Sequence, residues 1–138
     1  MVNVNMEINE VFDYTKEINV YNDGNKTSYC VGDKPFEEIM VSWNALLEGS
    51  HPMPALGVSI NKETVREMQK GLWVEFGFDE VLEANGLHFE KLLVNVSQDY
   101  YGFNLIRYNT RGGYDGRCLY IDLVGRNMTD FYNVVINI

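Results

Sequence analysis

The chain has 138 residues, 46% of them hydrophobic and 22% charged, a composition that predicts one globular domain over residues 1–138 and excludes general disorder. Its formal net charge of −9 disfavours nucleic-acid binding, because phosphate neutralisation needs clustered Lys and Arg. The N-terminus lacks the basic and apolar regions of a secretion signal, and no apolar run approaches the ~20 residues that span a bilayer, so we expect a cytoplasmic protein outside the membrane.

The first elements are predicted to be strands. Apolar and polar side chains alternate over residues 2–8, which is typical of a half-buried strand. Residues 17–21 and 26–31 then form a predicted hairpin, with Asp23-Gly24 as a type I′ turn. A two-residue turn there sets Val20 opposite Thr27.

Two helices follow. The first is predicted over Asp33–Glu48, with Asp33 as its cap and Pro35 in its first turn. The second is predicted over Asn61–Lys70, with Asn61 as its cap. Residues 49–57 between them contain two prolines and favour an extended path on the surface.

The pattern changes to period two at Leu72. Residues 72–78 alternate, and Asn85-Gly86 predicts a tight hairpin that pairs Leu82 with Phe89 and Glu80 with Lys91. Trp73 lies on the opposite face from Leu72, so either a helix covers it or it is an exposed aromatic anchor.

Residues 102–124 carry the densest alternating apolar pattern, and we expect this hairpin to form the centre of the sheet. A turn at Gly112-Gly113 pairs Phe103 with Asp122. A register shifted by one residue pairs Phe103 with Leu123 and matches the apolar faces better. A last strand is predicted over residues 131–138.

This order of elements predicts an α+β fold: a mainly antiparallel meander of about 6–8 strands, with the helices Asp33–Glu48 and Asn61–Lys70 packed on one face. The alternative is a strongly curved sheet or half-barrel around the first helix.

Four arginines within twenty residues stand out in an acidic chain, and three of them flank a glycine-rich loop. Arginine forks and free backbone N–H groups can hold a carboxylate or phosphate, although a solvated hairpin tip is the simpler interpretation. The candidate residues for an anionic ligand are Arg107, Arg111, Tyr114 and Arg117.

A second candidate surface is aromatic and acidic, as expected of a protein-binding face. Its residues are Trp73, Glu75, Tyr100 and Tyr101.

The spacing of residues predicts no catalytic or metal site. His51 and His88 are the only imidazoles, and neither Cys30 nor Cys118 lies in a nucleophile or zinc motif. We therefore expect no cofactor, and we expect that the protein is not an enzyme.

The leading hypothesis is a non-catalytic protein-binding module of bacterial or phage type, such as an immunity or inhibitor protein. The alternative is a small anionic-ligand binding protein, or an unrecognised enzyme, that uses the loop between Arg107 and Arg117. A third hypothesis is a homodimer formed through a sheet edge, with residues 131–138 as that edge.

Overall fold

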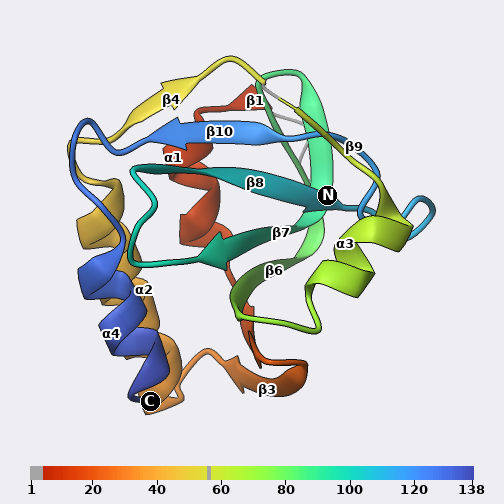
Figure 1. The fold of residues 1–138 in the computed structure, drawn as a ribbon. Coiled ribbons are helices and arrows are strands. Elements are labelled where there is room, and N and C mark those ends of the chain that lie inside the picture. The colour runs from red at the N-terminus through yellow and green to blue at the C-terminus, as the bar shows by residue number, and fades with distance from the viewer. Residues whose placement is uncertain (1–4, 56) are drawn as a thin grey trace.

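The computed structural model describes residues 5–55 and 57–138 and shows an α+β fold with a largely antiparallel main sheet (Figure 1). The strands of that sheet are β1 (Asn5–Met6), β2 (Glu17–Asn22), β3 (Asn25–Cys30), β4 (His51–Met53), β6 (Leu72–Ala84), β7 (Leu87–Val96), β8 (Gly102–Tyr108) and β10 (Leu119–Asp122). Strands β5 (Val58–Ser59) and β9 (Gly116–Arg117) form a small second sheet. The helices are α1 (Ile8–Val11), the 3-10 helix η1 (Phe12–Tyr14), α2 (Lys34–Leu47), α3 (Asn61–Glu67) and α4 (Thr129–Ile136).

Seven strands of the main sheet follow the order β3-β2-β6-β7-β8-β10-β4, each antiparallel to its neighbour, and β1 joins in parallel beside β6. This confirms the predicted α+β class and antiparallel sheet. The sheet is open, since within the described residues its end strands β3 and β4 pair with one neighbour each rather than with one another.

Two tight hairpins form where turn chemistry predicted them. Both residues of Asp23-Gly24 and of Asn85-Gly86 have positive φ, as a type I′ turn requires. The first turn pairs Val20 with Thr27, and the second pairs Leu82 with Phe89. Both predicted registers are therefore confirmed beside the turns.

The second hairpin changes register further from its turn. The predicted pair of Glu80 with Lys91 is wrong, because Lys91 lies opposite Gly77 instead. An irregularity between Gly77 and Leu82 inserts extra residues into β6, and Asp79 adopts a φ of 60° within it. Such bulges shift every later pair, and the turn that sets the local register carries no information about them.

The main core lies between α2 and one face of the sheet. Its centre is Trp43 of α2, which is fully buried. Four phenylalanine rings surround it, with centroids 4.7–5.2 Å from the centroid of Trp43: Phe12, Phe76, Phe103 and Phe131. These rings come from η1, β6, β8 and α4, so this tryptophan links the helical layer to the sheet.

The C-terminal segment forms a helix, so the predicted strand over residues 131–138 is wrong. Three β-branched residues, 134–136, favoured a strand in the sequence. The buried residues are instead spaced as on a helix, at Met128, Phe131 and Val135, and this face packs against α2. The sheet edge expected from this segment is therefore not formed.

The other face of the sheet is covered near α3. Met68, just after α3, packs with Trp73, Leu93 and Tyr114 in a second, smaller cluster. Trp73 alternates with Leu72 and Val74 of the main core, so its side chain points to the opposite face. Instead of lying beside α2, as expected, α3 thus packs on the far side of the sheet.

The hairpin over residues 102–124 lies toward one side of the sheet, and β7 occupies the central position. Neither predicted register occurs, because Phe103 lies opposite Ile121 and Leu105 opposite Leu119. A short bridge between Asn109 and Gly113 closes the hairpin tip, and β9 then leaves β8 to pair with β5. Because β9 pairs with β5, the residues between β8 and β10 are not paired as they would be in a continuous hairpin.

Two N-terminal boundaries also differ from expectation. Of the predicted strand over residues 2–8, Asn5 and Met6 form β1, Ile8 begins α1, and residues 2–4 lie outside the described residues. The cap of α3 is Ile60 rather than Asn61. The side chain of Asn61 instead accepts a hydrogen bond from the backbone N–H of Tyr114.

Candidate functional site

The predicted arginine loop is divided between the interior and the surface. Arg107 is buried, and its guanidinium donates through Nε to the carbonyl of Arg117 (2.7 Å) and through Nη1 to that of His88 (2.8 Å). Burial lowers the pKa of Arg107. Arg111 and Arg117 have exposed side chains. The three guanidinium groups therefore do not share one buried site, and Arg107 acts as a brace between β7, β8 and β9.

The fourth residue of that set, Tyr114, points into the protein. Its backbone N–H donates to Oδ1 of Asn61 (2.8 Å), and its carbonyl accepts from the hydroxyl of Ser59 (2.7 Å). Its hydroxyl donates a hydrogen bond to Oε2 of Glu75. Tyr114 thus fastens the arginine loop to α3, to β5 and to the sheet beneath them.

Glu75 is a buried acceptor, with 1% of its surface exposed. Its other oxygen accepts from Nδ2 of Asn19 (3.0 Å) and from the hydroxyl of Tyr21 (3.3 Å). Among the described residues no Lys or Arg forms an ion pair with it. The three hydrogen-bond donors therefore replace water around the carboxylate. Because Glu75 is buried, it is not part of an exposed protein-binding face, as the sequence had suggested.

Burial and this carboxylate act together on the two tyrosines. Burial, and then the negative charge of Glu75, raise the pKa of Tyr114 far above its ordinary value. The same two causes, in the same order, raise the pKa of Tyr21. Both phenols are thus held in the neutral form that donates to Glu75.

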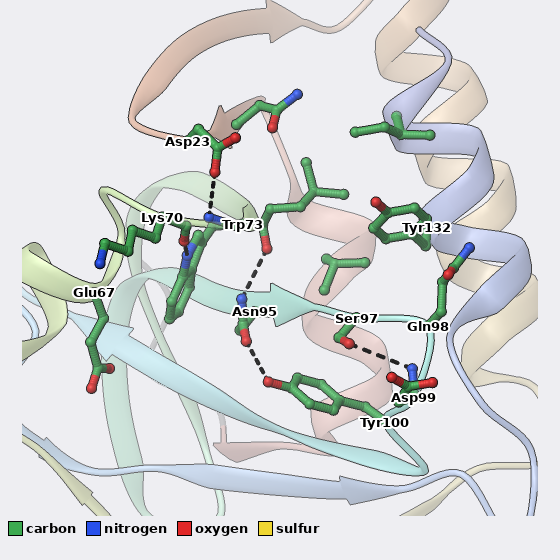
Figure 2. Close-up of a pocket in the computed structure, with 15 residues that line it drawn as sticks. Asp23, Glu67, Lys70, Trp73, Asn95, Ser97, Gln98, Asp99, Tyr100 and Tyr132 are labelled. Carbon is green, nitrogen blue, oxygen red and sulfur yellow. Dashed lines mark hydrogen bonds between the residues drawn. The ribbon is translucent and has the colours of Figure 1, made fainter.

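A groove lies where β6 begins and β7 ends, and it brings two of the predicted aromatic residues together (Figure 2). Its volume is about 720 Å³. Trp73 lies at its base, 6% exposed, with its indole N–H donating to the carbonyl of Lys70 (2.8 Å). Met68, at the C-terminal end of α3, packs against Trp73, so this tryptophan is covered rather than an exposed anchor. Tyr100 is 39% exposed and lies on the rim.

Asn95 fixes the position of Tyr100 (Figure 2). The Nδ2 of Asn95 donates to the carbonyl of Leu72 (3.0 Å), and its Oδ1 accepts from the hydroxyl of Tyr100 (2.7 Å). Because both ends of the amide are engaged, its orientation is defined by its partners. The aromatic rim is therefore preorganised rather than loose.

The groove is acidic. Asp23, Glu67 and Asp99 line it, against the single basic side chain of Lys70. Asp23 also holds the connection between α3 and β6, since its Oδ1 accepts from the N–H of Gly71 (2.8 Å). In Figure 2 the side chain of Lys70 extends away from Trp73 and Asn95. The charge presented to an approaching partner is therefore negative.

A second hollow, of about 300 Å³, continues the groove toward β8. Glu67, Trp73, Asn95 and Tyr100 line both hollows, which thus meet at these four residues. The second hollow then passes over β8 and Tyr120 of β10. The two hollows therefore adjoin at this end of the molecule.

The remaining candidates lie apart. Tyr101 is 60% exposed and is not among the residues lining either hollow. Cys30 is exposed on β3, Cys118 is buried beside β10, and both thiols are free. Within the described residues, no group of three or more His, Cys, Asp and Glu side chains is placed to hold a metal ion.

Sequence reasoning missed several groove residues because they come from separate elements. Asp23, Glu67, Asp99 and Tyr132 belong to a turn, a helix, a loop and another helix. One local indication existed: Asn95 interrupts an otherwise apolar strand end, and a polar residue there needs a partner.

Comparisons of the chain with protein-family models, with curated proteins and with solved structures found no match. In the part of the chain that the structure describes, no helix has the length and apolar character needed to cross a membrane. What the protein does is therefore inferred from the geometry of its surfaces alone.

Proposed function

We propose that the protein is a non-catalytic binding module that holds a partner protein in the groove between α3, the β7–β8 loop and α4, in the manner of an immunity or inhibitor protein of the cytoplasm. The observation that carries this proposal is the composition of the groove. It combines aromatic side chains held by hydrogen bonds with three carboxylates and one lysine.

Two features favour a protein partner over a reaction. The described residues that line the groove include neither a histidine nor a cysteine. Their hydrogen bonds join side chains to the backbone, or Tyr100 to Asn95, and none of these pairs a nucleophile with a base. Preorganised aromatic side chains also reduce the entropy lost when a partner is bound. The arginine loop is the weaker candidate for an interaction site, since Arg107 is already engaged by two carbonyls.

The proposal is tested by capturing proteins from native host cells on the wild-type chain and on a charge-reversed groove variant, Glu67→Lys with Asp99→Lys. Both side chains are exposed, so these changes should leave the fold intact. A matched control, Glu38→Lys with Glu48→Lys, makes the same change of charge on exposed positions of α2 and its C-terminus.

We expect one protein to be retained in stoichiometric amount by the wild type and by the control, and to be lost from the groove variant. The result that would overturn the proposal is a partner retained equally by all three, or no stoichiometric partner for the wild type. Circular dichroism of each variant verifies that it is folded.

A further inference from the structure

The place where the two hollows meet has the features of a seat for one cationic side chain. In the view of Figure 2, Trp73 and Asn95 lie between Glu67, which extends from α3, and Tyr100, which extends from the β7–β8 loop. A carboxylate thus stands on one side of these two residues and the exposed ring of a tyrosine on the other. These are the two groups that recognise an organic cation in proteins.

Glu67 is available for such a contact. Its side chain is exposed, and in the described part of the chain it forms no ion pair, although Arg66 is engaged by Glu63. Lys70, three residues further along, also forms no ion pair among the described residues, and its side chain extends away from Trp73 and Asn95 (Figure 2). The carboxylate of Glu67 is therefore left facing a hollow rather than a cation of its own chain.

Tyr100 is equally prepared. Its hydroxyl is held by Asn95, so the ring keeps its position without a ligand, and 39% of the residue is exposed. Asp99 precedes it on the same rim and adds a second negative charge nearby. A planar cation can lie on such a ring and at the same time donate to a carboxylate, whereas a compact ammonium has no flat face.

We infer that this meeting point binds an arginine side chain presented by the partner protein. The inference rests on the proposed function, because it names the group with which the partner enters the groove. Shape and charge both contribute: the guanidinium would lie on the ring of Tyr100, between the negative charges of Glu67 and Asp99, while the neighbouring segment of the partner extends into the two hollows.

The inference is tested with short peptides rather than with the unknown partner. N-acetyl-Gly-Arg-Gly-amide is titrated into the ¹⁵N-labelled protein and compared with the peptides that carry citrulline or lysine in place of arginine. Citrulline retains the planar shape without the charge, and lysine retains the charge without the plane. The indole N–H of Trp73 and the side-chain amide of Asn95 report on the seat, and the buried indole of Trp43 serves as an internal reference.

We expect the arginine peptide to shift the signals of Trp73 and Asn95 in a saturable way, with the signal of Trp43 unchanged. Both other peptides should bind roughly three- to tenfold more weakly. Glu67→Gln and Tyr100→Leu should each weaken binding of the arginine peptide by a similar factor. The matched controls Glu38→Gln and Tyr101→Leu, at exposed positions outside the groove, should leave it unchanged.

The inference is overturned if no saturable shift occurs at Trp73, if citrulline or lysine binds as well as arginine, or if Glu67→Gln has no effect. This outcome is separable from failure of the proposed function. A stoichiometric partner lost on groove charge reversal, together with no preference for arginine, would leave the function standing and remove only the seat.

Discussion

The hydroxyl of Tyr114 provides the most direct test of the buried network. Replacing Tyr114 by Phe keeps the ring, whose centroid lies 4.9 Å from that of Tyr108, and removes only the oxygen that donates to Glu75. Glu75 then keeps two donors, Asn19 and Tyr21, in a site that water does not reach. The variant therefore loses one hydrogen bond to a buried charge without creating a large cavity.

A hydrogen bond to a charged group contributes about 1.5–3 kcal/mol, so we expect the free energy of unfolding to fall by about 2 kcal/mol. With a urea m-value of roughly 1.5 kcal/mol/M, the unfolding midpoint would fall by about 1.3 M, which circular dichroism measures easily. Because Tyr114 also ties the arginine loop to α3, amide exchange should accelerate in both segments.

Two phenylalanine variants are matched controls. Tyr108→Phe removes a hydroxyl for which no protein partner is found among the described residues, and it should change stability by less than about 0.5 kcal/mol. Tyr21→Phe removes a longer hydrogen bond, 3.3 Å, from a half-buried side chain and should cost about 1 kcal/mol. Equal stability of Tyr114→Phe and Tyr108→Phe would refute the role assigned to the Tyr114–Glu75 contact.

Three further predictions concern the same region. Burial and Glu75 raise the pKa of Tyr21 and Tyr114 in the folded state. The stability that these two groups contribute should therefore be fully present below pH ~10, the ordinary tyrosine pKa, and should fall above it. Urea midpoints that stay level to pH ~11 would contradict this. Gly113→Ala should destabilise by about 2 kcal/mol, since φ is +67° there and a Cβ would lie 2.7 Å from Cγ of Asn61, whereas Gly112→Ala, with 3.9 Å of clearance, should be nearly neutral in thermal melts. Arg107→Lys cannot reach both carbonyls and should cost about 2 kcal/mol by urea unfolding, while Arg111→Lys on the surface should cost nothing measurable; equal effects would show that Arg107 is not a brace.

Some elements were predictable because their causes are local. The turns at Asp23-Gly24 and Asn85-Gly86 depend on residues that tolerate positive φ, and the pairs next to each turn follow from its length. The helix α2 begins after Asp33, as predicted, and follows from the proline in its first turn and a continuous apolar stripe. The side chain of Asp33 makes no capping hydrogen bond and accepts instead from the N–H of Cys30 (2.8 Å). Each of these features lies within a few residues of the structure that it specifies.

The failures have a common physical cause in long-range packing. The segment that forms α4 contains β-branched residues, yet the contact of Phe131 with Trp43 rewards a helix, and tertiary packing overrode local propensity. The register of β8 with β10 depended on an excursion that pairs β9 with β5, about fifty-eight residues away along the chain. Neither interaction is visible in a window of sequence around the element itself.

The sequence by itself determined the α+β class, the antiparallel hairpins, the first long helix and the excess of negative charge, because composition, turn chemistry and periodicity act locally. Only the tertiary structure decided which side chains meet. It buried Glu75 and Arg107, which looked like surface groups, and satisfied them with hydrogen bonds from distant elements. It also brought Glu67, Trp73, Asn95 and Tyr100 to one groove, because the ends of strands and helices far apart in sequence converge there.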